Sequence, residues 1–284
     1  MSEGDALSQS PSHAEKLRGL RWAVASESFC SAYGVLALGS ILILFLDELG
    51  LRKEQIGLLN GLIFLPGPIA LFIAPYLARF GSKRSLIIFY GARKIVAALL
   101  VLTPGVFAAG GESVAFAYVF AVMVLYGLCR VIAETAFYPW IQEFVPDQVR
   151  GQYMAVCNIV GTVASILAVV WSSYMLSSGT GIGRFQVVIA MGCALGLVGI
   201  MLKFPIPGGA PLAKRTDQRT HFRQMMEAVR DRGFRRFLSG LGVLALATGG
   251  WVAFVPLYLK EAIGLDVGAV VGLDRKSTRL NSSH

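Results

Sequence analysis

Long apolar stretches separated by short polar segments repeat along the chain. Several exceed the roughly 18 consecutive, mostly apolar residues that indicate a membrane-spanning helix, because about 20 residues at a rise of about 1.5 Å each cross about 30 Å of hydrocarbon. We expect spans at 22–46, 56–78, 85–108, 114–140, 153–176, 185–204 and 237–259, and residues 262–273 to open an eighth. The pattern predicts an all-α integral membrane protein.

The polar segments divide the chain into parts. Residues 1–21, rich in serine and charge, are expected to be a disordered cytoplasmic tail. Residues 22–204 are expected to form a six-helix transmembrane bundle, residues 205–236 a basic cytoplasmic loop, and residues 237–273 the start of a second bundle. Residues 274–284 change composition abruptly and look like the translation of a sequencing-library adapter. We therefore exclude them as a junction artefact and expect the natural chain to continue beyond Leu273.

The basic loop contains an amphipathic pattern. Four apolar residues recur at i, i+3, i+4 and i+7, namely Phe222, Met225, Met226 and Val229, with arginines between and after them. A helix with this pattern is expected to lie along the membrane surface. Two interpretations of its charge stay open: it enforces topology, or it binds lipid or a partner protein.

The distribution of lysine and arginine predicts the orientation. Short loops rich in these residues stay in the cytoplasm. The basic residues gather in alternate polar segments, at Lys16, Arg18, Arg21, Arg79, Lys83, Arg84, Arg150 and in a cluster from Lys203 to Arg236. The opposite side holds Arg52, Lys53, Arg184 and Lys260. We therefore expect a cytoplasmic N-terminus in a bacterial-type inner or plasma membrane.

Composition supports a membrane protein and excludes other classes. Apolar residues make up 55% of the chain and charged residues 15%, against roughly 25% charged in soluble domains. The formal charge of +9 does not indicate nucleic-acid binding, because the basic residues separate apolar runs instead of forming one soluble face. The expected partners are the lipid bilayer, a small solute and a coupling proton or cation.

Cysteine and histidine offer no cofactor or metal site. The cysteines, Cys30, Cys129, Cys157 and Cys193, form no CxxC pair and fall within expected spans, where we interpret them as small packing residues. The histidines lie outside the spans without metal-ligand spacing. HExxH, GxSxG and P-loop motifs are missing from the sequence, so we expect neither an enzyme nor a bound cofactor.

Four charged residues lie within apolar runs, at Glu27, Arg93, Arg130 and Glu134. A charge at the bilayer centre costs about 2.5 to 3.5 kcal/mol, so each should face a partner or a watery cavity. From the expected helix ends, Arg93, Arg130 and Glu134 lie about 12, 15 and 9 Å from the same surface. A network of the three is therefore feasible, and Arg130 and Glu134 share a helix face at i, i+4.

Several interpretations of these charges stay open. The network is a structural ion pair between helices, or its surplus positive charge contacts an anionic substrate group, or Glu134 or Glu27 carries a coupled proton. Alternatively, side chains extend to the lipid headgroups, which suits Lys94 and Glu27 best. The position of Glu27 near the start of the first helix favours stabilisation by the helix dipole over titration.

Other polar, aromatic and proline residues also mark the spans. Asn60, Asn158 and Trp251 are candidates for lining a cavity, with packing as the alternative. Prolines interrupt the second span at Pro66, Pro68 and Pro75 and the seventh at Pro256. Each removes a backbone donor and tends to kink its helix, as in transporters and in many static membrane bundles.

Three motifs resemble those of one family. "APYLARFGSKR" is similar to a cytoplasmic gating-loop signature, with matching residues at Arg79, Gly81, Lys83 and Arg84, although Ala74, Ala78 and Ser82 depart from it. "WIQEFVPDQVRGQYMAV" is similar to the turn between the fourth and fifth helices, through Pro146, Asp147, Arg150 and Gly151. "LYGLCRVIAETA" resembles the fourth-helix motif through Arg130, although Glu134 stands where glycine is expected.

These motifs and the span pattern resemble the major facilitator superfamily (MFS), truncated after the seventh transmembrane helix. The resemblance implies two six-helix bundles that rock around a midplane site, of which the chain would contain the first bundle and the first helix of the second. It implies a secondary active transporter of a small solute by alternating access, coupled to an ion or proton. The alternatives are a non-transporting sensor or assembly factor on the same scaffold and an integral membrane enzyme.

Overall fold

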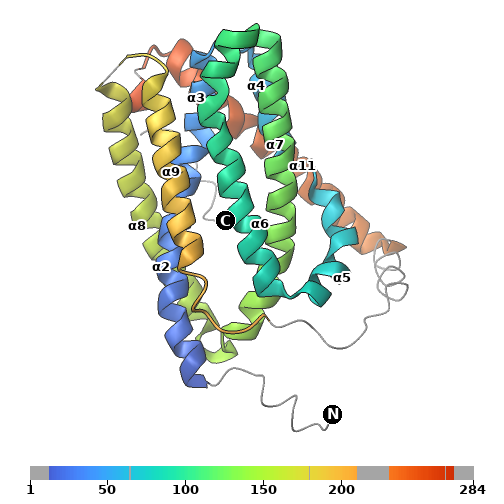
Figure 1. Ribbon diagram of the computed structural model, residues 1–284. Helices are drawn as coiled ribbons and strands as arrows, with labels where there is room; N and C mark the ends of the chain where they lie inside the picture. Colours follow the sequence, from blue (N-terminus) through green and yellow to red (C-terminus); the bar gives the residue numbers. More distant parts are fainter. Residues whose placement is uncertain (1–12, 64, 179, 210–229, 266, 272–284) are drawn as a thin grey trace.

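The protein is a bundle of helices (Figure 1). The computed structural model describes residues 13–63, 65–178, 180–209, 230–265 and 267–271, and that part contains no strand. The helices are α2 (His13–Ala37), α3 (Gly39–Glu48), α4 (Lys53–Leu62), α5 (Ala70–Phe80), α6 (Ser82–Ala98), α7 (Thr103–Phe144), α8 (Arg150–Ser177), α9 (Gly183–Met201) and α11 (Arg232–Glu261). Short 3-10 helices are η1 (Gly67–Ile69), η2 (Leu99–Leu102) and η3 (Asp147–Val149). The predicted all-α class is confirmed.

Helix length and composition confirm a membrane protein. Within the described residues, four helical stretches are long and apolar enough to cross a bilayer: Glu15–Glu48, Ser82–Phe144, Asp147–Ser177 and Gly183–Met201. The second stretch has 63 residues, far more than the roughly 20 that one crossing needs. It reverses at Gly111, where φ is 75° and ψ is −171°, a conformation that favours glycine. The reversal produces two neighbouring helices that run in opposite directions (Figure 1).

The second expected span is interrupted. Residues 56–78 fall on α4, η1 and α5, and the break lies at Pro66 and Pro68. Proline lacks an amide hydrogen, and its ring clashes with the preceding turn, so a continuous α-helix does not pass through this pair. The predicted proline kink is therefore present, as a break between two short helices.

Glycines on α9 bring it close to α2. Gly192, Gly196 and Gly199 lie on the face that packs against α2. A Cβ atom added at Gly192 would lie 2.7 Å from the Cβ of Leu36. At Gly199, the main-chain oxygen accepts a hydrogen bond of 2.7 Å from the Ser26 hydroxyl. Small residues therefore permit the close backbone approach that stabilises helix pairs in a membrane.

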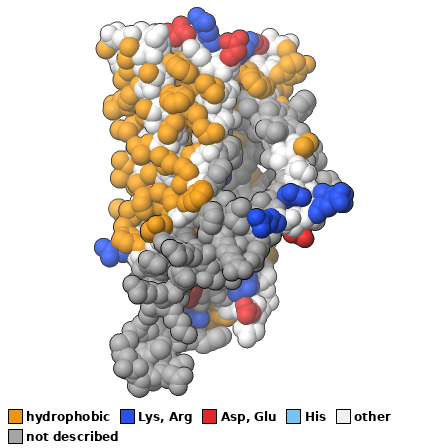
Figure 2. Space-filling model, turned by 90° about the vertical axis from the view of Figure 1, so that its right-hand side faces the viewer, with side chains coloured by type: hydrophobic (Ala, Val, Ile, Leu, Met, Phe, Trp, Pro, Cys, Tyr) orange, Lys and Arg blue, Asp and Glu red, His pale blue; other side chains and the backbone are white. Residues whose placement is uncertain are grey.

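Much of the described exterior is apolar. Figure 2 shows a broad surface of hydrophobic side chains with charged side chains at its edges. Large exposed side chains include Leu125, Ile159, Val163, Leu167, Val170 and Val187. Such a continuous apolar surface is unusual on a soluble protein and is expected where lipid tails are the solvent.

Ion pairs join α11 to α3 and α4. Helix α11 packs against α3 and α4. The Lys260 amine lies 2.5 Å from Asp47 Oδ2 and 3.7 Å from Glu48 Oε2. Arg184 Nη2 lies 3.9 Å from Glu48 Oε1, and Lys53 pairs with Glu261. We call these residues the α11 latch; it links the ends of α3, α4, α9 and α11.

The N-terminal expectation needs a correction. Helix α2 begins at His13, so residues 13–21, which were expected to be disordered, are helical. The reason is tertiary: Leu20 and Ala23 pack in a hydrophobic cluster with Trp140 of α7. Residues 1–12, the amphipathic pattern at 222–229 and residues 274–284 lie outside the described residues.

Candidate functional site

Three charged residues meet between α6 and α7. The Arg130 Nε atom lies 2.7 Å from Glu134 Oε1, and Arg93 Nη1 lies 3.6 Å from the same oxygen. The side chain of Arg93 is 8% exposed, that of Arg130 24% and that of Glu134 43%. The network expected from helix depths is therefore present, with the carboxylate on its more exposed side.

Local structure explains this geometry. Arg130 and Glu134 are four residues apart on α7, so their side chains lie on one helix face. Helix α6 packs along α7 and carries Arg93 toward that face. Packing of α6 against α7 thus adds Arg93 to the pair of Arg130 and Glu134.

Tyrosine rings surround the cations. The guanidinium carbon of Arg93 lies 4.2 Å from the ring centroid of Tyr90 and 5.7 Å from that of Tyr126. The Lys94 amine lies 3.4 Å from the centroid of Tyr33 and 4.5 Å from that of Tyr90. Cations over aromatic faces are stabilised by about 0.5 to 2 kcal/mol, more when water is excluded.

Lys94 departs from the sequence expectation. Its side chain is fully buried, and among the described residues its amine has no hydrogen-bond partner. The expected extension toward the headgroups is therefore wrong. Residue 94 faces α2 and α9, where the absence of a side chain at Gly196 leaves room for the lysine stem and the Tyr33 ring.

A second buried lysine was missed in the sequence. Lys203 follows α9 and is 3% exposed, and its amine lies 5.7 Å from the Tyr90 and Phe137 ring centroids and 6.0 Å from that of Trp140. Because Lys203 lies at the end of an apolar span, it was counted with the basic residues of the cytoplasmic loop. We call Arg93, Lys94, Arg130 and Lys203 the cationic cluster. For this cluster, the sequence offered one signal: Lys94 follows Arg93 directly within an apolar run.

The remaining candidates for coupling or for lining a cavity are Glu27, Asn60, Asn158 and Trp251. Glu27 on α2 is partly buried and makes no ion pair within the described part of the chain. It lies several turns beyond the start of α2, so the helix-dipole interpretation is wrong. Asn60 on α4 is partly buried and Asn158 on α8 is exposed. Trp251 lies on α11, and its side chain is outside the described structure.

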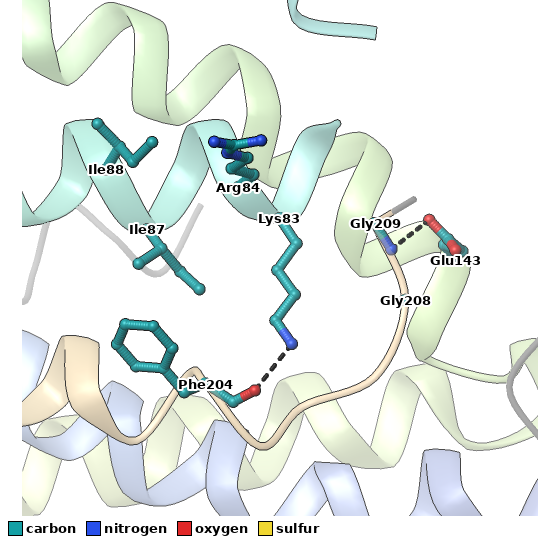
Figure 3. A pocket seen from close by; sticks show the side chains of 8 residues that line it. All are labelled: Lys83, Arg84, Ile87, Ile88, Glu143, Phe204, Gly208 and Gly209. Atoms are coloured by element: carbon teal, nitrogen blue, oxygen red, sulfur yellow. Dashed lines mark hydrogen bonds between the residues drawn. The ribbon is translucent and has the colours of Figure 1, made fainter. Parts of the chain in front are cut away.

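The gating-loop motif holds the chain that follows α9. The Lys83 amine donates a hydrogen bond of 2.8 Å to the main-chain oxygen of Phe204 (Figure 3). It donates a second one, of 2.5 Å, to the main-chain oxygen of Ile206. The amide of Gly209 donates to a carboxylate oxygen of Glu143 at 2.8 Å. Two helices, α6 and α7, therefore fix the course of residues 204–209.

The rest of the motif shapes the same region. Gly81 forms the turn between α5 and α6 with φ of 100°. The guanidinium carbon of Arg84 lies 4.8 Å from the Phe80 ring centroid, and the side chain of Arg79 is not described. An open groove of about 530 Å³ runs beside Lys83 and Arg84, with Ile87, Ile88 and Phe204 on its apolar wall (Figure 3).

Replacing Lys83 by methionine is expected to lower the free energy of unfolding by about 1 to 2 kcal/mol, because two main-chain oxygens lose a charged donor. Thermal unfolding in detergent measures this. Arg84→Met is the matched control, since Arg84 is exposed and stacks on one ring. Equal destabilisation by both variants would contradict the role given to Lys83.

The turn after α7 is held locally. Pro146 precedes η3, and Arg150 Nη2 lies 2.5 Å from Asp147 Oδ1. The same nitrogen donates to the main-chain oxygen of Val145 at 3.5 Å. Gly151 is exposed at the start of α8. These residues therefore form the connection between α7 and α8.

The architecture and motifs agree with a comparison against known families. Within the described residues, no group of three or more His, Cys, Asp or Glu side chains has a metal-binding arrangement. A comparison with curated proteins gave no match. The family comparison matches residues 25–273 to the Major Facilitator Superfamily. The chain therefore belongs to the major facilitator superfamily, whose members are multi-pass membrane transporters of small solutes.

Proposed function

We propose that the protein is a secondary active transporter that moves a small solute by alternating access, coupled to a proton or another ion. The observation that carries this proposal is the cationic cluster inside an apolar bundle. Each charge near the bilayer centre costs about 2.5 to 3.5 kcal/mol, and such charges mark substrate and ion pathways. In the described part, Glu134 pairs with Arg93 and Arg130, while aromatic rings face Lys94 and Lys203.

Two further features support alternating access. The break between α4 and α5 lies in a helix that packs against α7, and discontinuous helices are common around transporter sites. The α11 latch joins α11 to the first bundle by ion pairs, which can separate when bundles rock. The positive-inside distribution of lysine and arginine supports a cytoplasmic N-terminus in a bacterial-type inner or plasma membrane.

Solute flux into liposomes tests the function. The chain as its source gene encodes it would be reconstituted and offered labelled acetate, lactate, benzoate, glucose and choline under a pH or sodium gradient. We expect at least one solute to accumulate above its external concentration and to leak out when an ionophore collapses the gradient. A solute that binds the protein but never crosses the membrane would favour the sensor interpretation and contradict transport.

Replacing Arg93 by glutamine is expected to lower that flux at least 100-fold, because a buried cation of the network is lost while its shape is largely kept. Initial uptake rates measure the effect. The control is Arg52→Gln, since Arg52 pairs with Glu112 at 3.5 Å but its side chain is 73% exposed. Unchanged flux in the Arg93 variant would remove Arg93 from the transport site.

A further inference from the structure

We propose that Glu134 is the exchange point at which a coupled proton and a substrate carboxylate replace each other, so that one proton and one monocarboxylate cross together. This inference rests on the proposed transport function and adds its substrate class and coupling. It starts from one atom: Glu134 Oε1 lies 2.7 Å from Arg130 Nε and 3.6 Å from Arg93 Nη1.

Because a single carboxylate serves both guanidinium groups, one protonation weakens both ion pairs. A proton added to Glu134 yields a neutral carboxylic acid, and no covalent bond of the protein breaks. Arg93 and Arg130 then lose their ion pairs with Glu134. Guanidinium groups favour carboxylates, which match their planar array of donors, so an incoming carboxylate takes the vacated place.

Exposure gives the exchange a direction. The Glu134 side chain is 43% exposed, whereas that of Arg93 is 8% exposed. The acid is therefore reached from the open side, and the cations lie behind it. An anion that approaches from that side meets Glu134 first and gains access to the cations once the acid is neutral.

The surroundings favour an anion over a cation. The charged and titratable groups around the network come from each neighbouring element: Arg93, Lys94 and Tyr90 of α6, Arg130 and Tyr126 of α7, Tyr33 and Glu27 of α2, and Lys203 after α9. Cations outnumber carboxylates in this set, so a neutral Glu134 leaves a strongly positive site.

The cycle balances in charge. The carboxylate carries −1 and the proton +1, so the pair moves no net charge. Release reverses the steps: the carboxylate leaves the guanidinium groups, Glu134 gives up its proton to the same side, and its ion pairs form again. The membrane potential should therefore not drive the transport, whereas a pH gradient should.

The test uses the reconstituted full chain with acetate, lactate and benzoate as probes and glucose as the neutral control. Internal pyranine reports proton entry, and labelled solute reports uptake. After subtraction of the passive entry of undissociated acid into protein-free liposomes, we expect proton entry to accompany monocarboxylate uptake in a 1:1 ratio, with rates unaffected by a valinomycin-imposed potassium potential. Uptake of glucose but no carboxylate would overturn this inference and leave the proposed transport function standing; absence of flux for every solute would overturn both.

The decisive variant is Glu134→Gln, which mimics the protonated acid. It should keep at least one tenth of the wild-type exchange of labelled against unlabelled carboxylate, while uphill accumulation under a pH gradient is lost. Glu134→Asp, which keeps the titrating group, should restore part of that accumulation and shows that the position tolerates change. Uphill accumulation by the glutamine variant at the wild-type level would refute the exchange at Glu134.

Discussion

Replacing Lys94 by methionine is expected to raise the free energy of unfolding by about 2 kcal/mol and to lower solute flux at least tenfold. The amine is fully buried and has no hydrogen-bond partner among the described residues, so its desolvation is only partly offset by the rings of Tyr33 and Tyr90. Methionine has a similar volume without the polar end, and apolar replacement of buried charge often stabilises by about 1 to 4 kcal/mol.

Flux falls for a different reason. In the proposed anion site, the Lys94 amine next to Arg93 would strengthen the attraction for the substrate, and methionine removes that attraction. Equilibrium unfolding in mixed detergent micelles and uptake by liposomes measure the two effects separately. We expect the free energy of unfolding to rise and the flux to fall, as for a group that is retained for function at a cost in stability.

Lys260→Met serves as the control for this prediction. Lys260 lies 2.5 Å from Asp47 and 3.7 Å from Glu48, so its loss leaves two carboxylates without that partner. We expect it to destabilise the protein. If Lys94→Met destabilises to the same extent, the amine of Lys94 contributes a favourable interaction, and the argument from its isolation fails.

Alanine at Gly192 is expected to lower the free energy of unfolding by about 2 kcal/mol, because the new methyl group meets atoms that have little room to move. Its Cβ would lie 2.7 Å from Leu36 Cβ and 3.1 Å from the amide nitrogen of Ala37. Backbone cannot yield as a flexible side chain does. Helices α2 and α9 would have to separate along their whole contact.

The same substitution at Gly34 is the matched control. An added Cβ at Gly34 meets nothing within 4 Å, and the residue lies inside α2. Alanine there should stabilise by up to about 1 kcal/mol through helix propensity alone. Unfolding transitions of both variants measure the difference, and a loss of stability at Gly34 as large as at Gly192 would show that close packing is not the cause.

Local and periodic features were predictable. Arg130 and Glu134 pair because they lie four residues apart on one helix, and that spacing is visible in the chain. The expected depths along the spans also placed Arg93 at the same distance from the membrane surface as Arg130 and Glu134, to within a turn. The break at Pro66 and Pro68 follows from proline chemistry, although its division of the span into α4 and α5 required the structure.

Features that depend on neighbours from distant segments were not predictable. Nothing in the sequence indicated that Glu27 would take no part in the ion pairs of the described residues. Residues 13–21 read as a polar tail, yet Leu20 and Ala23 find the Trp140 cluster and the helix begins at His13. A single sequence does not record which helix faces will meet, so burial from such contacts is invisible in it.

The sequence by itself determined that this is a helical membrane protein of the major facilitator type, because the lengths of apolar runs and the short motifs depend only on residues that are close together in the chain. Only the tertiary structure decided that Lys94 and Lys203 join Arg93 and Arg130 in one buried cationic cluster. Their amines lie among aromatic rings from α2, α6 and α7, and that enclosure arises when helices far apart in sequence pack together.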